Sequence, residues 1–175
     1  MAQPATATSD PTELRWDLSD LYKSDDDPAL ERDFAASKDA ADTLARHRGT
    51  VVAMRPAALC ELLAEYERLL VLTWRPGVYA SLRFSADTGD AAAQALLGRA
   101  REHGARLSTV MRFVDVEIKT APEVAFAGWA DAAELAPYHH FLKAARRGAP
   151  HTLSEPEERV ATLKGLTGAA AWSQL

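Results

Sequence analysis

The stretch HTLSEPEERV, residues 151–160, places a histidine four positions before a glutamate and so offers half of a helical metal site. A helical zinc-peptidase site needs two imidazoles at i and i+4 on one face, with a carboxylate directly after the first one to activate water. Thr152 follows His151, and Glu155 stands where the second histidine would be needed. The spacing therefore argues against a metal site at this position.

The same stretch has the features of a helix start. Ser154 and Glu157 form the S-x-x-E pattern of a capping box, and Pro156 falls in the first turn, where a missing N–H costs nothing. The neighbouring glutamates add negative charge at the positive end of the helix dipole. We therefore expect a helix to begin here, with His151 in the loop before it.

Two other groups of residues have side chains that bind metal ions in proteins. His139 and His140 are adjacent, so on a helix they point about 100° apart and cannot share an ion as an i, i+4 pair does. The aspartates at 25–27 open like a calcium loop, but Leu30 occupies the position that needs glycine. We expect the aspartates to be capping charges, and one of the two histidines to be packed while the other is exposed.

Three further side chains could take part in chemistry or in ligand binding. Cys60 is the single cysteine, which excludes an internal disulfide, and its apolar helical surroundings favour a buried, unreactive thiol over a nucleophile. His103 and Glu117 fall near the apolar face of a predicted helix, where polar groups could line a ligand cleft, although satisfied core or edge groups are the commoner outcome. The sequence has no glycine-rich phosphate loop and no G-x-S-x-G elbow.

The composition limits the class of protein. The 175 residues are 47% hydrophobic and 26% charged, which suits one globular domain with a substantial core. The net charge of −5 leaves no basic stripe to neutralise a phosphate backbone, so nucleic acid is not an expected partner. The sequence contains neither a signal-peptide pattern nor a run of roughly 18 apolar residues. We expect a cytoplasmic protein with no membrane partner and a mobile tail over residues 1–12.

Helical periodicity runs through most of the chain and predicts an all-α fold, an antiparallel bundle-like array of about five to seven helices over residues 13–175. The first helix follows the aspartates, with Pro28 in its first turn and Gly49 as a stop. The apolar positions of the first two helices form the expected core: Leu30, Phe34, Ala41, Leu44, Leu59, Leu62, Leu63, Tyr66, Leu69 and Leu70.

The second and third helices are expected to be long. The second begins near Pro56, and Pro76 with Gly77 should kink or interrupt it. The third follows the turn ADTGD, with Asp87 or Asp90 as its cap. It includes the segment FVDVEI, which alternates as a strand would but continues a long helical period.

The last third of the chain is expected to contain shorter helices. One starts at Pro122, a break follows from Gly128 to Pro137, and another helix continues to Arg147 before Gly148 ends it. The final stretch, residues 163–175, is too apolar for a solvated terminus, so we expect it to expose apolar surface.

Three segments in order and in register resemble the N-terminal part of oligoendopeptidase F, of the thimet-type family of zinc metallopeptidases. They are WDLSDLYKSDDDP (residues 16–28), VYASLRFSADTGDAAAQALLGRA (78–100) and PYHHFLKAARRGAPHTLSEPEERV (137–160). The resemblance extends over nearly the whole chain. It implies a helical region that forms one wall of a deep channel, opposite a catalytic half that holds the zinc.

The resemblance also implies where the zinc is bound. In that family the ligands are the two histidines of H-E-x-x-H and a glutamate on a later helix, and the glutamate of the motif activates the attacking water. No H-E-x-x-H occurs in this sequence. No catalytic, metal-binding or substrate-binding residue can therefore be assigned in it, because its five histidines match none of those ligands: His47, His103, His139, His140 and His151.

Two functions follow from these observations. The first is the channel-wall segment of a zinc-dependent oligoendopeptidase that hydrolyses short peptides, with the catalytic half as its partner and the oligopeptide as substrate. The chain ends at AAAWSQL, soon after a helix begins, so we expect a fragment that binds no zinc and is inactive alone. The alternative is a free-standing helical module that holds a partner helix in an apolar groove. The family analogy favours the first function.

Overall fold

The structure is a computed structural model that describes residues 16–151, 153–168 and 172. Within these residues it contains six α-helices and no strand, which confirms the predicted all-α fold. The expected tail over residues 1–12 lies outside the described part. The helices are α1 (Pro28–Leu44), α2 (Pro56–Ala86), α3 (Ala91–Lys119), α4 (Glu123–Ala130), α5 (His139–Gly148) and α6 (Glu155–Thr167), with short 3₁₀ turns at Ala45–His47, Val51–Ala53, Ala133–Tyr138 and Ala149–His151.

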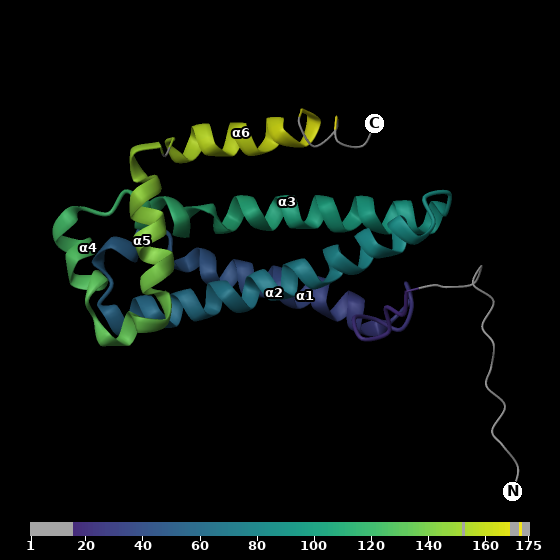
Figure 1. Cartoon of the computed structure of the whole chain (residues 1–175), viewed down its shortest axis with the longest axis horizontal. Helices are drawn as coiled ribbons and strands as arrows, with labels where there is room; N and C mark the ends of the chain where they lie inside the picture. The colour runs from purple at the N-terminus through teal and green to yellow at the C-terminus, as the bar shows by residue number, and fades with distance from the viewer. Residues whose placement is uncertain (1–15, 152, 169–171, 173–175) are drawn as a thin grey trace, which may run out of the picture.

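The three long helices form the body of the molecule. Successive helices among α1, α2 and α3 run in opposite directions, and each of the three contacts the other two. Figure 1 shows α4 and α5 at one end of this body, with α5 crossing the ends of the long helices and α6 returning along α3. None of the described helices is both long and apolar enough to cross a membrane.

Side-chain caps fix where α1 and α3 begin. Asp27 accepts a hydrogen bond from the N–H of Ala29 at 2.8 Å, with Pro28 directly after it in the first turn of α1. Asp90 accepts from the N–H of Ala92 at 2.8 Å and caps α3, which decides between the two aspartates that the sequence offered. Gly49, with φ of 79°, lies in the loop between α1 and α2, in a backbone region that side chains disfavour.

Pro76 and Gly77 were expected to kink or interrupt α2; the interruption is wrong, because α2 is one helix from Pro56 to Ala86, and the kink stays a prediction. The ring of Pro76 is buried inside the molecule. Packing of α2 against both α1 and α3 along this part holds the helix together where one backbone hydrogen bond is missing. The segment FVDVEI is helical, as predicted, within α3.

The later helices shift slightly from their expected bounds. Helix α4 continues past Gly128 to Ala130, and α5 begins at His139, after a 3₁₀ turn that contains Pro137. Helix α6 begins as predicted, with Ser154 as N-cap in a capping box: the Glu157 carboxylate accepts from the N–H of Ser154 at 2.8 Å.

Most of the apolar side chains expected in the core are buried, and two of them are only partly buried. Eight of the ten side chains named above are buried: Leu30, Phe34, Ala41, Leu44, Leu59, Leu62, Leu63 and Leu69. Tyr66 and Leu70 are only partly buried. Both line an open groove on the side of α2 that α1 does not cover.

Candidate functional site

The histidines form no shared metal site in the described part of the chain. His139 lies at the start of α5, where its Nε2 is 3.0 Å from the carbonyl oxygen of Ala132, while its neighbour His140 is exposed. His151 is exposed at the end of a 3₁₀ turn before α6. Among the described residues, no group of three or more His, Cys, Asp or Glu side chains could hold a metal ion. The described side chains of this chain therefore do not fit a zinc centre.

Ser37 and His103 make a serine–histidine contact that is structural. The Ser37 hydroxyl donates to the Phe34 carbonyl at 3.0 Å, so it accepts from Nε2–H of His103, which lies 2.8 Å away. Burial, with smaller effects of Arg99 and Arg106, lowers the pKa of His103 and favours this neutral form. Ser37 is fully buried in α1, so no substrate can reach its hydroxyl as a nucleophile.

Glu117 also has a structural role and does not meet His103. One carboxylate oxygen accepts from the N–H of Gly49 at 2.6 Å and the other from the N–H of Val51 at 3.1 Å. The side chain thus fixes the loop between α1 and α2 against the end of α3. His103 and Glu117 are both satisfied, as expected, but each by partners of its own.

A polar cluster anchors the segment before α1 to α2. The Asp25 carboxylate accepts from Tyr79 at 2.9 Å and from Nε and Nη2 of Arg83 at 3.0 and 2.9 Å. Arg83 also donates to Asp90, the cap of α3. The hydrogen bonds from Arg83 lower the pKa of Asp25. Burial, and after it the hydrogen bond to Asp25, raise the pKa of Tyr79 to about 12. Of the aspartates expected to be capping charges, Asp25 instead ties the segment before α1 to α2.

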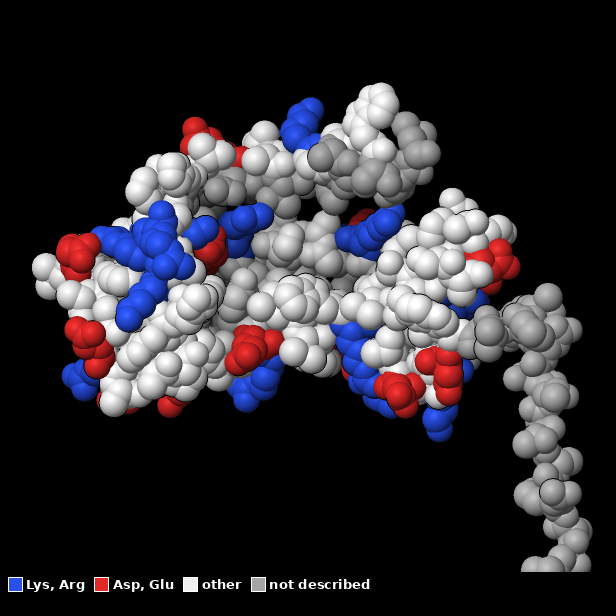
Figure 2. All heavy atoms as spheres, viewed as in Figure 1, with Lys and Arg blue, Asp and Glu red and all other residues white. Residues whose placement is uncertain are grey.

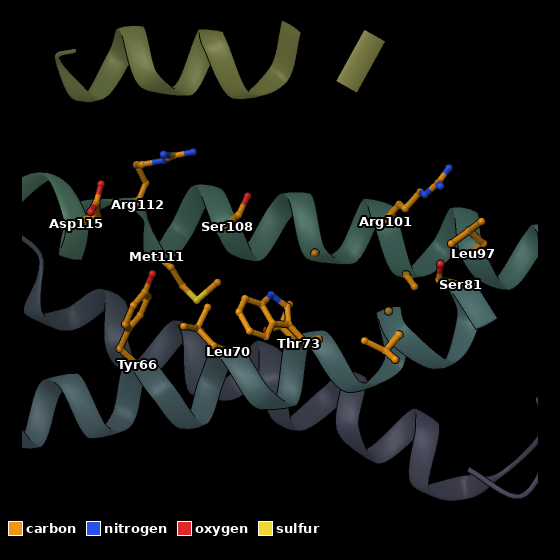
Figure 3. Close-up of a pocket in the computed structure, with 15 residues that line it drawn as sticks. Tyr66, Leu70, Thr73, Ser81, Leu97, Arg101, Ser108, Met111, Arg112 and Asp115 are labelled. Atoms are coloured by element: carbon orange, nitrogen blue, oxygen red, sulfur yellow. The ribbon is translucent and has the colours of Figure 1, made fainter. Parts of the chain in front are cut away.

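An open groove of about 600 Å³ runs between α2 and α3 on the face shown in Figures 2 and 3. Large side chains close one end of it, where Tyr66 and Leu70 of α2 face Met111 of α3. Burial, and then the charge of Asp115, raise the pKa of Tyr66, so its hydroxyl is protonated at neutral pH. Small residues make up much of the remaining lining: Gly77, Ser81, Ala100, Gly104 and Ser108.

The two rims of the groove differ in chemistry. On α2, Val71, Trp74 and Val78 are 60%, 63% and 48% exposed at positions i, i+3 and i+7 and so form one apolar stripe. Trp74 and Val78 line the groove, and Val71 lies outside its lining. On α3, Arg101 and Arg112 line the groove and extend away from α2 toward α6 in Figure 3. We call these two edges the apolar rim and the basic rim.

The chain is similar in sequence to known proteins. A model of the oligopeptidase F family matches residues 117–175. The chain is 27% identical over 144 residues to oligopeptidase PepF of Bacillus subtilis (strain 168), and the aligned part is 82% of this chain and 21% of that protein. The chain is similar to the N-terminal region of oligopeptidase F. Both comparisons confirm the predicted resemblance, and no solved structure matches the chain significantly.

The chain spans about a fifth of the length of the oligopeptidase that it matches. The part matched by the oligopeptidase F family begins at the end of α3 and contains α4, α5 and α6. The residues that line the groove, from Tyr66 to Asp115, therefore all lie outside that family match.

Arg146 holds the oligopeptidase F-like helices on the body of the molecule. Its guanidinium donates to the carbonyl of Ala121 at 2.8 Å, pairs with Glu123 and lies over the Phe126 ring, 5.1 Å from the centroid. The partners Ala121 and Glu123 lie 25 and 23 positions before Arg146, so no local sequence pattern indicated this contact between α5 and α4. It positions the connection that leads to α6.

The expected apolar surface at the end of the chain is seen where residues are described. Leu163 of α6 and Trp172 are both exposed. The alanines at 169–171 and residues 173–175 lie outside the described part. Leu163 also faces a second hollow between α6 and α3, which Arg101 shares.

Proposed function

We propose that this chain is the N-terminal, channel-wall segment of a zinc-dependent oligoendopeptidase that hydrolyses short peptides. The observation that supports it best is the alignment with the Bacillus subtilis oligopeptidase over 82% of the chain. The family match over residues 117–175 supports the same assignment and includes the last of the three segments that first suggested it, residues 137–160.

In this proposal the chain contributes shape, and the catalytic half contributes the chemistry. The sequence has no H-E-x-x-H, and among the described residues no group of three or more His, Cys, Asp or Glu side chains could hold a metal ion. Zinc is therefore assigned to the catalytic half, where it would polarise the peptide carbonyl and activate water. The rigid wall of α1, α2 and α3 limits which oligopeptides fit the channel. We also propose that the peptidase is cytoplasmic.

A second function is favoured by one observation, the open groove with its apolar rim. A free-standing module would use such a groove to hold a helix of a separate protein. The two proposals differ in where the occupant of the groove is encoded. In the first it is part of the same peptidase, and in the second it is not.

The decisive experiment has two steps. The transcript is sequenced beyond the codon for Leu175, and we expect an open frame that contains H-E-x-x-H. The 175-residue chain and the longer product are then purified, dialysed and tested for zinc and for cleavage of a quenched fluorescent peptide. We expect the longer product to hold one zinc per chain and cleave the peptide, and the 175-residue chain to do neither. A frame without the motif, or hydrolysis by the short chain, would contradict the proposal.

A further inference from the structure

We propose that the contact between Ser37 of α1 and His103 of α3 is a pH-sensitive switch, which holds the two helices together while His103 is neutral and weakens when His103 is protonated. The switch is part of a group of side chains that we call the α1–α3 seam, made up of Glu31, Phe34 and Ser37 of α1 with Arg99 and His103 of α3. All of these residues belong to this chain, so the switch is independent of the proposed function.

The contacts of the seam follow one another along both helices. Ser37 is fully buried, and its hydroxyl lies 2.8 Å from Nε2 of His103. Toward the N-terminal ends of the two helices, the Glu31 carboxylate accepts two hydrogen bonds from the Arg99 guanidinium, one of them 2.6 Å long. The Phe34 ring packs against both α3 residues: its centroid is 4.9 Å from that of the His103 ring and 4.3 Å from Cζ of Arg99. Each contact therefore depends on how closely α1 approaches α3.

The hydrogen bonds of the seam fit the neutral form of His103. The Ser37 hydroxyl donates to the Phe34 carbonyl at 3.0 Å and so accepts from Nε2–H, which leaves Nδ1 as the atom that takes up a proton. Protonation would place a charge on a ring that packs against a phenylalanine and a buried serine, where water solvates it poorly. Burial is accordingly the largest cause that lowers the pKa of His103.

The arginines on α3 also oppose the protonation of His103. Arg99 lies four positions before it and Arg106 three positions after it, the spacing of side chains on the same side of a helix. After burial, the charges of Arg99 and Arg106 are the causes that lower the pKa of His103. A protonated His103 would be a third cation on this side of α3.

The groups that face this side of α3 do not reverse that effect. Both arginines already have a carboxylate partner, Glu31 of α1 and Glu102 of α3. Helix α2 presents an uncharged side chain at this level, because Cγ2 of Thr73 lies 4.0 Å from where a Cβ on Gly104 would be. A proton on His103 would therefore add positive charge to a seam whose ion pairs are already formed.

The switch acts in a defined pH range. The ordinary pKa of histidine, 6.5, applies to the unfolded chain, and the folded-state pKa of His103 lies below it. The stabilisation by neutral His103 is therefore complete above 6.5 and is lost as the pH falls from 6.5 toward the lower folded-state pKa. Because α1 shares a buried core with α2 and α3, mild acid should weaken the body of the molecule at this seam.

The first test compares the pH dependence of stability in the 175-residue chain and two variants. His103→Gln keeps an amide that can donate to Ser37 but takes up no proton, and His140→Gln is the matched change at an exposed histidine. Urea denaturation is carried out at about pH 7.5 and about pH 5.5. We expect acidification to raise the equilibrium constant for unfolding several-fold more in wild type and His140→Gln than in His103→Gln. An equal rise in all three proteins would overturn the switch.

A second measurement needs no variant. The imidazole resonances of the wild-type chain are assigned by through-bond correlation and followed by NMR as the pH is lowered. The resonances of His103 should titrate with a midpoint below 6.5, because the folded state opposes its protonation. A midpoint at or above 6.5 would overturn the switch whatever the variants show.

The contribution of charge is tested by the same titration. Arg99→Gln removes a neighbouring positive charge and releases Glu31, and both changes should raise the midpoint of His103. Arg147→Gln makes the same change of charge on an exposed part of α5 and should leave the midpoint where it is. An unchanged midpoint in Arg99→Gln, or an equal shift in both variants, would contradict a seam in which Arg99 opposes the protonation of His103.

Discussion

The two sides of α2 differ in how they are completed. Toward α1 and the segment before it, α2 makes specific polar contacts: Arg75 donates to the carbonyl of Leu21 at 2.8 Å and lies over the Tyr22 ring, and Tyr79 and Arg83 bind Asp25. Toward the groove, Trp74, the residue next to Arg75, is largely exposed. One helix thus carries a finished interface and an open one.

This difference separates the side chains that stabilise the chain from the side chains that are available to contact a partner. Side chains on the finished side contribute to the free energy of unfolding of the chain itself. The apolar rim contributes little to that free energy, because Val71, Trp74 and Val78 remain in contact with water. A contiguous exposed apolar surface of this kind marks an interaction site in a protein that is otherwise well packed.

The largest expected contrast comes from truncating neighbouring apolar residues on the two sides. Leu69 is 1% exposed, so Leu69→Ala should lower the free energy of unfolding by about 2–5 kcal/mol through lost burial and a cavity. Val71→Ala, two residues away on the apolar rim, should change it by less than about 0.5 kcal/mol. Urea denaturation of the 175-residue chain measures both. Comparable losses in the two variants would show that the rim is already covered in this chain.

A smaller effect is expected for the polar anchor on the finished side. Asp25→Ala removes the acceptor for Tyr79 and Arg83 and should cost about 1.5 kcal/mol. The exposed neighbour Asp26 is the matched control, and Asp26→Ala should cost less than about 0.5 kcal/mol. Equal costs would mean that the cluster does not hold the N-terminal segment on α2.

The cost of Asp25→Ala should depend on pH in a defined direction. Hydrogen bonds from Arg83 hold the folded-state pKa of Asp25 below its ordinary value of 3.8. The stabilisation by ionised Asp25 is therefore complete above that value and is lost as the pH falls through the lower folded-state pKa. Denaturation curves of wild type and Asp25→Ala should converge as the pH is lowered below 3.8. A difference that grows with acid would contradict this assignment.

Local patterns were sufficient to predict the helices and most of the core. Capping signals such as Asp27–Pro28 and Ser154–Glu157 act within one turn, so they can be recognised without tertiary structure. The error at Pro76 arose because packing on α1 and α3, which no local pattern records, keeps α2 in one piece. Propensity gives way to tertiary contacts at such a position.

The candidate site was less predictable because its residues are close only in space. Tyr66 and Leu70 have the spacing of core residues, and the sequence does not say which part of an apolar stripe remains open. The exposed triplet Val71, Trp74 and Val78 does have helical spacing outside that stripe, and this signal could have found the apolar rim. The pairing of Asp25 with Arg83, 58 positions apart, has no local signal at all.

The most direct test that this side of α2 is open in the chain is Gly77→Ala. A Cβ at Gly77 meets no atom within 4 Å, so the change should raise the free energy of unfolding of the 175-residue chain by about 1 kcal/mol through helix propensity. Gly98→Ala, on an exposed part of α3 with equal space, is the matched control and should stabilise the chain to a similar extent. Urea denaturation of both variants measures the two changes. Stabilisation by Gly98→Ala together with destabilisation by Gly77→Ala would contradict an open groove in this chain.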